Sequence, residues 1–312
     1  MGYSHYSVMK NEILSFINTK ENKTLIDATL GMGGHTLSIS EASSGRFNFL
    51  CFDQDKESIK IAKEKLSPFK ENIKYFHTNF KNLKNYIDDK VDYILADLGI
   101  STYQLSNKKR GFSFTSDERL DMRMDKEQIL DAHYIINNYN LNNLSAILRD
   151  FGEERNHFKI ASYICKERTK KKINTCKELS DLIDRCSSKK SKINSSTKTF
   201  MALRIEVNNE LNSLKEFLKN SLSLLKPKGR LMVISFHSLE DRIVKNFMKF
   251  SEKNCICPST QMFCSCNKKS ELKILTKKPI LPCESEINEN QSSRSAKLRV
   301  GEAIWLTQDW LA

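Results

Sequence analysis

The chain has 312 residues, of which 39% are hydrophobic and 29% are charged, and its formal net charge is +13. No stretch approaches the roughly 20 consecutive apolar residues that a transmembrane helix needs, so the composition excludes a membrane-spanning protein. No basic segment followed by an apolar one marks a secretion signal, and we expect a protein of the cytoplasm. The positive charge favours a polyanion as partner, although singly scattered lysines would give the same balance.

Strands and helices are predicted to alternate over the first part of the chain. Short apolar runs indicate the strands, and apolar residues at helical spacing indicate the helices. The expected strands are 24–28, 47–53, 73–77 and 91–97, and the expected helices are 7–16, 35–43 and 58–66. This βαβαβ rhythm predicts a parallel, doubly wound α/β sheet.

The alternation stops after the fourth strand. Residues 101–221 contain little that is typical of a buried strand and instead hold helical runs at 144–151 and 178–186. The second run begins with a capping-box pattern at 175–178 (TCKE). We expect the Ser- and Lys-rich residues 186–198 to form an exposed loop.

Strand signals return after this helical region. Residues 230–236 form an apolar run behind a Pro-Lys-Gly turn at 227–229, and a helix is expected after Ser238. A segment beyond the insertion is therefore predicted to complete the sheet. The expected domains are a discontinuous sheet domain, 1–104 with 217–312, and a helical insertion, 105–216.

A glycine-rich loop follows the first predicted strand, at residues 27–35 (DATLGMGGH). Glycines let the backbone approach a ligand closely. A dinucleotide-binding loop would read G-x-G-x-x-G and hold a pyrophosphate at the start of the helix. This loop reads G-x-G-G, and Asp27 would repel a pyrophosphate but could hold an ammonium group. The pattern therefore disfavours a nicotinamide dehydrogenase.

The other predicted strands also end in residues suited to a nucleoside ligand. Asp53 could accept both hydroxyls of a ribose, or it could cap the next helix. Phe80 could stack on an adenine or pack in the core. Asp97 lies where open α/β sheets bind ligands, at the carboxyl end of the fourth strand.

Four of the nine cysteines form two C-x-C pairs. Cys255, Cys257, Cys264 and Cys266 would supply the four thiolates of a tetrahedral structural zinc site. Their spacing is tighter than the usual C-x₂₋₄-C, so bound zinc and four free thiols in a loop both remain open. Without a secretion signal, disulfides are not expected.

Eight strings of residues carry a resemblance to a known family. They are 29–35 (TLGMGGH), 97–101 (DLGIS), 110–114 (RGFSF), 120–125 (LDMRMD), 152–155 (GEER), 202–205 (ALRI), 234–242 (ISFHSLEDR) and 294–299 (RSAKLR). Over nearly its whole length the chain resembles the bacterial ribosomal RNA small-subunit methyltransferase H family. It departs from the family where prolines are replaced, for example at Thr102-Tyr103 in place of Ser-Pro, which suggests looser loops.

The resemblance implies a Rossmann-like class I methyltransferase sheet interrupted by a helical domain. It implies S-adenosylmethionine as cofactor, and a cytidine N4 in the decoding region of 16S ribosomal RNA, within the small ribosomal subunit, as substrate. The implied cofactor contacts are Gly33, Gly34, His35, Asp53, Phe80, Asp97 and Gln104. Whether the protein is a monomer or a homodimer stays open.

Methyl transfer to cytosine N4 needs hydrogen-bond acceptors, because the amine lone pair is delocalised into the ring and a proton must leave. Asp97 or the Leu98 carbonyl could accept, unless Asp97 only caps the loop or holds cofactor. His237 follows the last predicted strand and could line the pocket or cap the next helix.

Residues of the insertion are expected to meet the target base, which must leave its stack unless it is already unpaired. Phe112 and Phe114 could stack on it beside Arg110, and Asp121 is a further candidate for substrate contact. A buried aromatic cluster would explain the two phenylalanines equally.

Two other functions remain open. A DNA cytosine-N4 or adenine-N6 amino-methyltransferase would share the cofactor, but residues 97–100 lack the Asp/Asn-Pro-Pro-aromatic motif that such enzymes have in common. A non-catalytic, RNA-binding ribosome assembly factor would use the positive charge alone. The intact glycine loop and strand-end aspartates argue against it.

Overall fold

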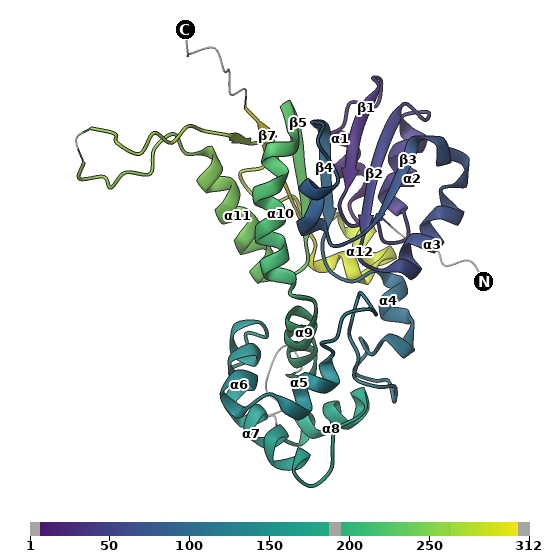
Figure 1. Cartoon of the computed structure of the whole chain (residues 1–312), viewed down its shortest axis with the longest axis vertical. Coiled ribbons are helices and arrows are strands. Elements are labelled where there is room, and N and C mark those ends of the chain that lie inside the picture. Colours follow the sequence, from purple (N-terminus) through teal and green to yellow (C-terminus); the bar gives the residue numbers. More distant parts are fainter. Residues whose placement is uncertain (1–6, 187–194, 262, 305–312) are drawn as a thin grey trace. The chain divides into compact units, whose positions relative to one another are not determined.

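The computed structural model describes residues 7–186, 195–261 and 263–304 (Figure 1). Internal contacts divide the chain into a sheet unit, residues 1–99 with 212–312, and a helical unit, residues 100–211. The boundaries expected from the sequence, 104/105 and 216/217, fall slightly further along the chain. Within the described ranges, no helix has both the length and the apolar character that crossing a membrane would require.

The sheet unit is built on seven strands in the order β3-β2-β1-β4-β5-β7-β6. The strands are β1 (Lys23–Asp27), β2 (Phe47–Asp53), β3 (Ile73–His77), β4 (Val91–Asp97), β5 (Leu225–Ser235), β6 (Leu272–Ile274) and β7 (Lys297–Ala303). Strands β1 to β5 are parallel, whereas β7 pairs antiparallel with both β5 and β6. The predicted α/β sheet is therefore confirmed, with an antiparallel edge that the sequence pattern did not indicate.

Helices cover both faces of this sheet, because successive strand residues point to opposite sides. The helices of the unit are α1 (Lys10–Ser15), α2 (Gly34–Ala42), α3 (Lys56–Lys65), α10 (Glu210–Leu224), α11 (Ser238–Glu252) and α12 (Glu284–Glu289), with 3₁₀ turns η1 (Ser67–Asn72), η2 (Phe80–Asn85) and η4 (Gln291–Ser295). Leu25 and Leu95 face a core shared with α1, α2 and α3. Their neighbours Ile26 and Ile94 face a second core with α10 and α11. Burial on both faces fixes the strand register.

The helical unit has its own apolar core, formed by α5 to α9 and the segment around Leu120. Its helices are α4 (Thr102–Ser106), α5 (Ala132–Asn138), α6 (Leu141–Asp150), α7 (His157–Arg168), α8 (Cys176–Cys186) and α9 (Ser195–Asn208), with the 3₁₀ turn η3 (Lys108–Arg110). The predicted capping box at the start of α8 is confirmed. There the Thr175 N–H donates to Glu178 Oε2 and the Glu178 N–H donates to Thr175 Oγ1, both at 3.2 Å.

Two expectations about local structure were wrong. Of the predicted loop 186–198, residues 187–194 lie outside the described residues. Residues 195–198 are helical and not a loop, because α9 starts at Ser195, whose side chain is buried. The expected turn at 227–229 belongs to β5, where Lys228 adopts a φ of +61° and the register against β4 shifts. Such an irregularity lets a strand continue through residues that would otherwise form a turn.

Candidate active site

Three neighbouring parallel strands each end in an aspartate. Asp27, Asp53 and Asp97 are the last residues of β1, β2 and β4. These strands are adjacent in the order β2-β1-β4, so their carboxyl ends lie at one edge of the sheet. Open α/β sheets bind ligands at this edge. The glycine loop between β1 and α2 starts there as well.

Gly33 shapes the end of this loop. Its φ of +74° is a left-handed conformation, and a Cβ atom at Gly33 would lie 2.8 Å from Leu66 Cδ1. The position therefore requires glycine for its backbone and for its packing. Gly34 is the first residue of α2. The N–H groups of the first turn of α2, which have no partner within the helix, give this end a partial positive charge.

Asp27 holds the loop from within the protein. Its buried carboxylate accepts hydrogen bonds from Thr36 Oγ1 at 2.7 Å and from the Thr29 N–H at 3.3 Å. Burial raises the pKa of Asp27. Asp27 therefore positions the loop against α2, and the contact with an ammonium group that its sequence position suggested stays a prediction.

Asp53 joins the end of β2 to the glycine loop. Its Oδ2 accepts the Gly31 N–H at 2.7 Å, and its Oδ1 accepts the Asp55 N–H at 2.8 Å. Burial raises the pKa of Asp53 to about 7. The side chain that caps α3 belongs to Asp55, which removes the capping alternative for Asp53. The residue keeps some exposed surface, and the ribose contact considered for its carboxylate stays a prediction.

His35 and Asp97 form a close pair whose hydrogen-bonding capacity is not used up. His35 Nε2 lies 3.4 Å from Asp97 Oδ2. In the described part of the chain, His35 Nε2 and Asp97 Oδ1 are among the buried polar atoms without a hydrogen-bond partner. Burial alone would lower the pKa of His35, but the carboxylates of Asp97, Asp27 and Glu286 together outweigh it and raise that pKa. An unpartnered buried polar atom costs about 1–3 kcal/mol, so this pair is where polar groups of a ligand are expected.

Phe80 takes the core-packing role considered for it, and its contact with an adenine stays a prediction. Its ring packs edge-to-face on Phe217, with ring centroids 5.1 Å apart, and it contacts the second core of the sheet unit. Phe80 is nevertheless only partly buried. Asn79 fixes the start of η2 by accepting the Lys81 N–H at 3.0 Å. Part of the Phe80 ring thus remains available to a ligand.

His237 takes the helix-capping role that the sequence allowed as an alternative. It is the N-cap of α11, and its Nδ1 accepts the Glu240 N–H at 3.5 Å. Glu240 Oε2 accepts the His237 N–H at 3.4 Å, which completes a capping box, and it also accepts the Phe236 N–H at 2.9 Å. A catalytic role of His237 stays a prediction.

Gln104 lies in the helical unit, where it is buried. Its Oε1 accepts the Ser101 N–H at 3.0 Å, and its own N–H donates to Ser101 Oγ at 3.2 Å. This capping box starts α4. The cofactor contact that the resemblance implies for Gln104 also stays a prediction.

Arg110 was expected to contact RNA from an exposed surface, but the structure buries it. It is 2% exposed, and its Nη2 donates to the backbone carbonyls of Arg123 at 3.0 Å and Met124 at 2.9 Å. Asp121 accepts a hydrogen bond from Arg123 Nε at 2.8 Å. Burial acts to raise the pKa of Asp121, but Arg123 outweighs it and lowers that pKa. Arg110 and Asp121 therefore stabilise the segment 110–125. Their partners, two backbone carbonyls and the Arg123 guanidinium, belong to the same segment.

The two phenylalanines of the same segment follow the alternative of a buried aromatic cluster. Phe112 is buried in the core of the helical unit. Phe114 is partly buried and packs edge-to-face on Phe200, with ring centroids 6.0 Å apart. Base stacking by Phe112 is not supported by its surroundings, because its ring is buried. Base stacking by the partly buried Phe114 stays a prediction.

A basic groove of the helical unit was missed in the sequence. It has a volume of about 480 Å³ and is lined by Phe158, Lys159, Ser162, Tyr163, Lys166, Arg185 and Cys186. Aromatic and cationic side chains side by side suit a nucleic-acid strand. The sequence of α7 already contains part of this pattern, because residues 159, 163 and 166 recur at helical spacing. The groove residues of α8 could not be added from the sequence, because they join the groove only when α8 packs against α7.

The four clustered cysteines also come together in the structure. Their sulfur atoms all lie within 4.8 Å of one another, in the loop between α11 and β6. This set could hold a metal ion, as the sequence suggested.

Comparison with known proteins relates the chain to enzymes of known class. The MraW methylase family model matches residues 2–304. The chain is 43% identical over 311 residues to the ribosomal RNA small subunit methyltransferase H of Clostridioides difficile, with 97% of this chain and 100% of that protein covered. It is 47% identical over 307 residues, with the same coverage, to the protein of that name from Caldicellulosiruptor saccharolyticus. An rRNA methylase structure from Streptococcus thermophilus covers 95% of this chain and 94% of that one at 10% identity and a TM-score of 0.43, too weak a likeness to add to the assignment.

This Rossmann-like sheet and these relatives together define the class of the protein: it is an S-adenosylmethionine-dependent methyltransferase. The predicted fold, a class I methyltransferase sheet with a helical insertion, is thereby confirmed. The chain belongs to the MraW methylase family, as the resemblance indicated.

Proposed function

We propose that the protein methylates N4 of a cytidine in the decoding region of small-subunit ribosomal RNA, using S-adenosylmethionine. The relatives named above are ribosomal RNA small subunit methyltransferases. The observation that carries the proposal is the His35–Asp97 pair, whose unpartnered buried atoms lie at the ligand-binding edge of a methylase-family sheet. We further propose that the reaction takes place in the cytoplasm, on the small subunit.

The groups at this edge fit S-adenosylmethionine. The Asp53 carboxylate can accept the ribose hydroxyls, and Phe80 keeps part of its ring for the adenine. The first turn of α2, from Gly34 on, offers N–H groups to the carboxylate of the methionine moiety. When bound, the cofactor supplies a methyl group already activated on a sulfonium sulfur. The protein has to orient the acceptor amine and exclude water.

Asp97 is the proposed acceptor for the amine protons. Its Oδ1 is buried and without a hydrogen-bond partner among the described residues, and its backbone N–H is fixed by Thr29 Oγ1 at 2.6 Å. The raised pKa of His35 keeps that imidazole cationic over a wider pH range, and a cation cannot accept a proton. Within the pair, Asp97 therefore takes the N4 proton while His35 orients its carboxylate.

The groove between α7 and α8 is the proposed contact for the RNA backbone. Lys159, Lys166 and Arg185 line it, and each is exposed. Contacts of lysine and arginine with phosphates supply most sequence-independent affinity for RNA. The net charge of +13 acts in the same direction. Selection of one cytidine is then left to contacts with the base itself.

The test is methyl transfer from labelled S-adenosylmethionine to small ribosomal subunits from a strain that lacks this gene. Parallel reactions with bare 16S ribosomal RNA and with duplex DNA separate the substrate classes. Digestion to nucleosides and mass analysis are expected to show N4-methylcytidine from subunits only. Transfer to DNA alone would support the DNA amino-methyltransferase. A protein that binds small subunits but neither binds the cofactor nor transfers a methyl group would support the assembly factor.

A further inference from the structure

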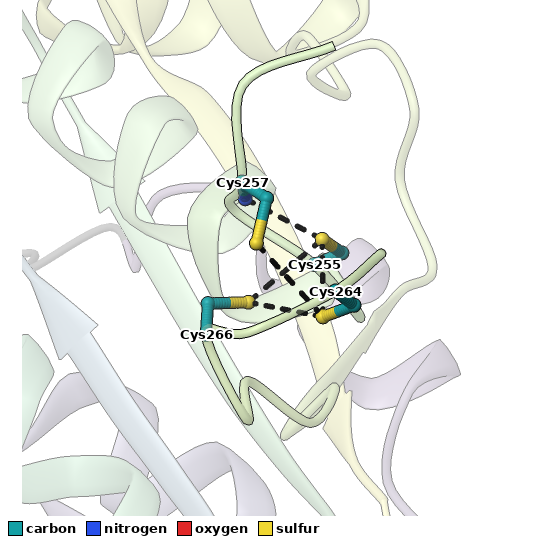
Figure 2. Close-up of side chains that lie close together, drawn as sticks. All are labelled: Cys255, Cys257, Cys264 and Cys266. Carbon is teal, nitrogen blue, oxygen red and sulfur yellow. Dashed lines mark hydrogen bonds between the residues drawn. The ribbon is translucent and has the colours of Figure 1, made fainter. Parts of the chain in front are cut away.

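Four cysteines converge in the loop that connects α11 to β6. Cys255 and Cys257 lie on one arm of the loop, and Cys264 and Cys266 lie on the other. Figure 1 shows this loop, in light green, extending away from the sheet. In Figure 2 all four sulfur atoms point toward a common centre. All four cysteines are free thiols.

The distances between these sulfurs are those of a metal-sized cage. Cys264 Sγ lies 3.5 Å from Cys255 Sγ, 3.6 Å from Cys266 Sγ and 4.0 Å from Cys257 Sγ, and Cys266 Sγ lies 3.8 Å from Cys255 Sγ. Four thiolates around zinc at about 2.3 Å have sulfur–sulfur separations of about 3.8 Å in a regular tetrahedron. A disulfide would need about 2.05 Å. The arrangement therefore matches ligation better than oxidation.

Backbone N–H groups support three of these sulfurs at the positions that would orient metal ligands. The Ile256 N–H points at Cys266 Sγ at 3.3 Å, and the Ser265 N–H points at Cys257 Sγ at 3.4 Å. The Cys257 N–H points at Cys255 Sγ at 3.4 Å. Donors of this kind stabilise the negative charge of thiolates and fix the geometry of metal ligands.

The loop has little else to order it. No described residue from Glu252 to Glu271 is buried, and Phe263 is 82% exposed. The described part of this segment contains neither helix nor strand beyond the end of α11. A short segment without an apolar core usually needs a covalent or metal cross-link to keep one conformation.

We propose that Cys255, Cys257, Cys264 and Cys266 bind one structural zinc ion that orders this loop. Each thiol gives its proton to solvent as its sulfur binds the metal, and no electrons are transferred. Zinc suits four thiolates in tetrahedral geometry, and all four positions are filled by protein. The ion is therefore structural, and the proposal does not depend on the methyl-transfer reaction.

The experiment measures metal and thiol protection in the full-length protein. Elemental mass spectrometry of protein prepared without chelator, before and after equilibration with zinc, is expected to give one zinc per chain. Alkylation under native conditions should modify Cys283, which is exposed and outside the cluster, while the four clustered cysteines stay protected until a strong chelator is added. Cobalt in place of zinc should show the visible absorption of a tetrahedral thiolate site.

Matched variants locate the metal. Cys257→Ser and Cys264→Ser are each expected to lose most of the bound zinc, and Cys283→Ser is expected to keep it. Trypsin should then cleave at Lys268 or Lys269 faster in the two cluster variants. The proposal is overturned if zinc-equilibrated protein holds no zinc and its four thiols react as fast as Cys283. Two disulfides by mass, or iron in place of zinc, would overturn it as well.

Discussion

The sheet edge and the segment 110–125 of the helical unit both carry family-like strings, yet they use their polar residues differently. At the sheet edge, His35 Nε2 and Asp97 Oδ1 are buried without hydrogen-bond partners in the described part of the chain, although His35 Nε2 lies 3.4 Å from Asp97 Oδ2. In the segment 110–125, Arg110 donates to two backbone carbonyls and Asp121 pairs with Arg123. A buried polar group without a hydrogen-bond partner needs an explanation, and a ligand bound at the sheet edge would supply one for these two atoms.

The largest effect is expected at the unpaired site. Asp97→Asn keeps the shape of the side chain but removes the charge that accepts the N4 proton. General base catalysis contributes about 10²–10⁴-fold, so the rate at saturating cofactor should fall by at least about 100-fold. Single-turnover methylation of small subunits, with cofactor affinity measured separately by titration calorimetry, checks this. If only cofactor affinity changed and the saturated rate did not, Asp97 would be a binding residue.

The next effect tests the structural side of the comparison. Arg110→Ala leaves the carbonyls of Arg123 and Met124 without their donor, and it should lower the free energy of unfolding by about 2–4 kcal/mol. Thermal unfolding checks this, with Lys109→Ala, an exposed neighbour, as the control. Unchanged stability combined with weaker RNA binding would return Arg110 to the role of an RNA contact.

A smaller effect is expected from pH. Burial raises the pKa of Asp53 to about 7, so this carboxyl is mainly protonated at pH 6 and mainly ionised at pH 8. Ribose hydroxyls donate to the ionised form, and cofactor affinity should therefore rise about tenfold from pH 6 to pH 8. Titrations across this range check it. Asp53→Asn should bind more weakly and lose the dependence, whereas an unaltered pH profile in that variant would assign it to another group, such as His35.

The smallest effect is expected in the basic groove. Lys166→Gln and Arg185→Gln should each weaken RNA binding several-fold. Each should also lower the slope of log affinity against log salt concentration by about 0.7–0.9, because one cation no longer meets a phosphate. Binding to 16S ribosomal RNA at several salt concentrations measures both quantities. Lys172→Gln, an exposed lysine outside the groove, serves as the control. Equal weakening in all three variants would indicate a diffuse charge effect with no specific groove.

The sequence predicted the parts of the structure that depend on local pattern. Strands β1 to β4 each contain a short apolar run, and the aspartates that end β1, β2 and β4 could be placed because parallel strands end at a common edge. It did not indicate β7, because the run KLRVGEA becomes a strand only through pairing with β5 and β6. Domain order followed from where the alternation of strands and helices stopped.

The candidate site was predicted to a similar extent. The glycine loop that contains Gly33 and the strand-end positions of Asp53 and Asp97 were singled out from local pattern, and the roles of these residues in cofactor binding stay predictions. The burial of Arg110 was missed because charged residues are rarely buried, and the carbonyls that satisfy it come from residues 123 and 124 only after folding. The groove needed the packing of α7 against α8. Strand-end residues could therefore be predicted from local pattern, whereas partners that meet only in the folded chain could not.

The most direct test of the central claim is nucleoside mass analysis of small subunits after incubation with labelled S-adenosylmethionine and either the natural protein or the Asp97→Asn variant. The account predicts N4-methylcytidine with the natural protein and at most about one hundredth of that rate with the variant. No labelled N4-methylcytidine with natural protein that binds the cofactor, or equal rates for both proteins, would contradict it.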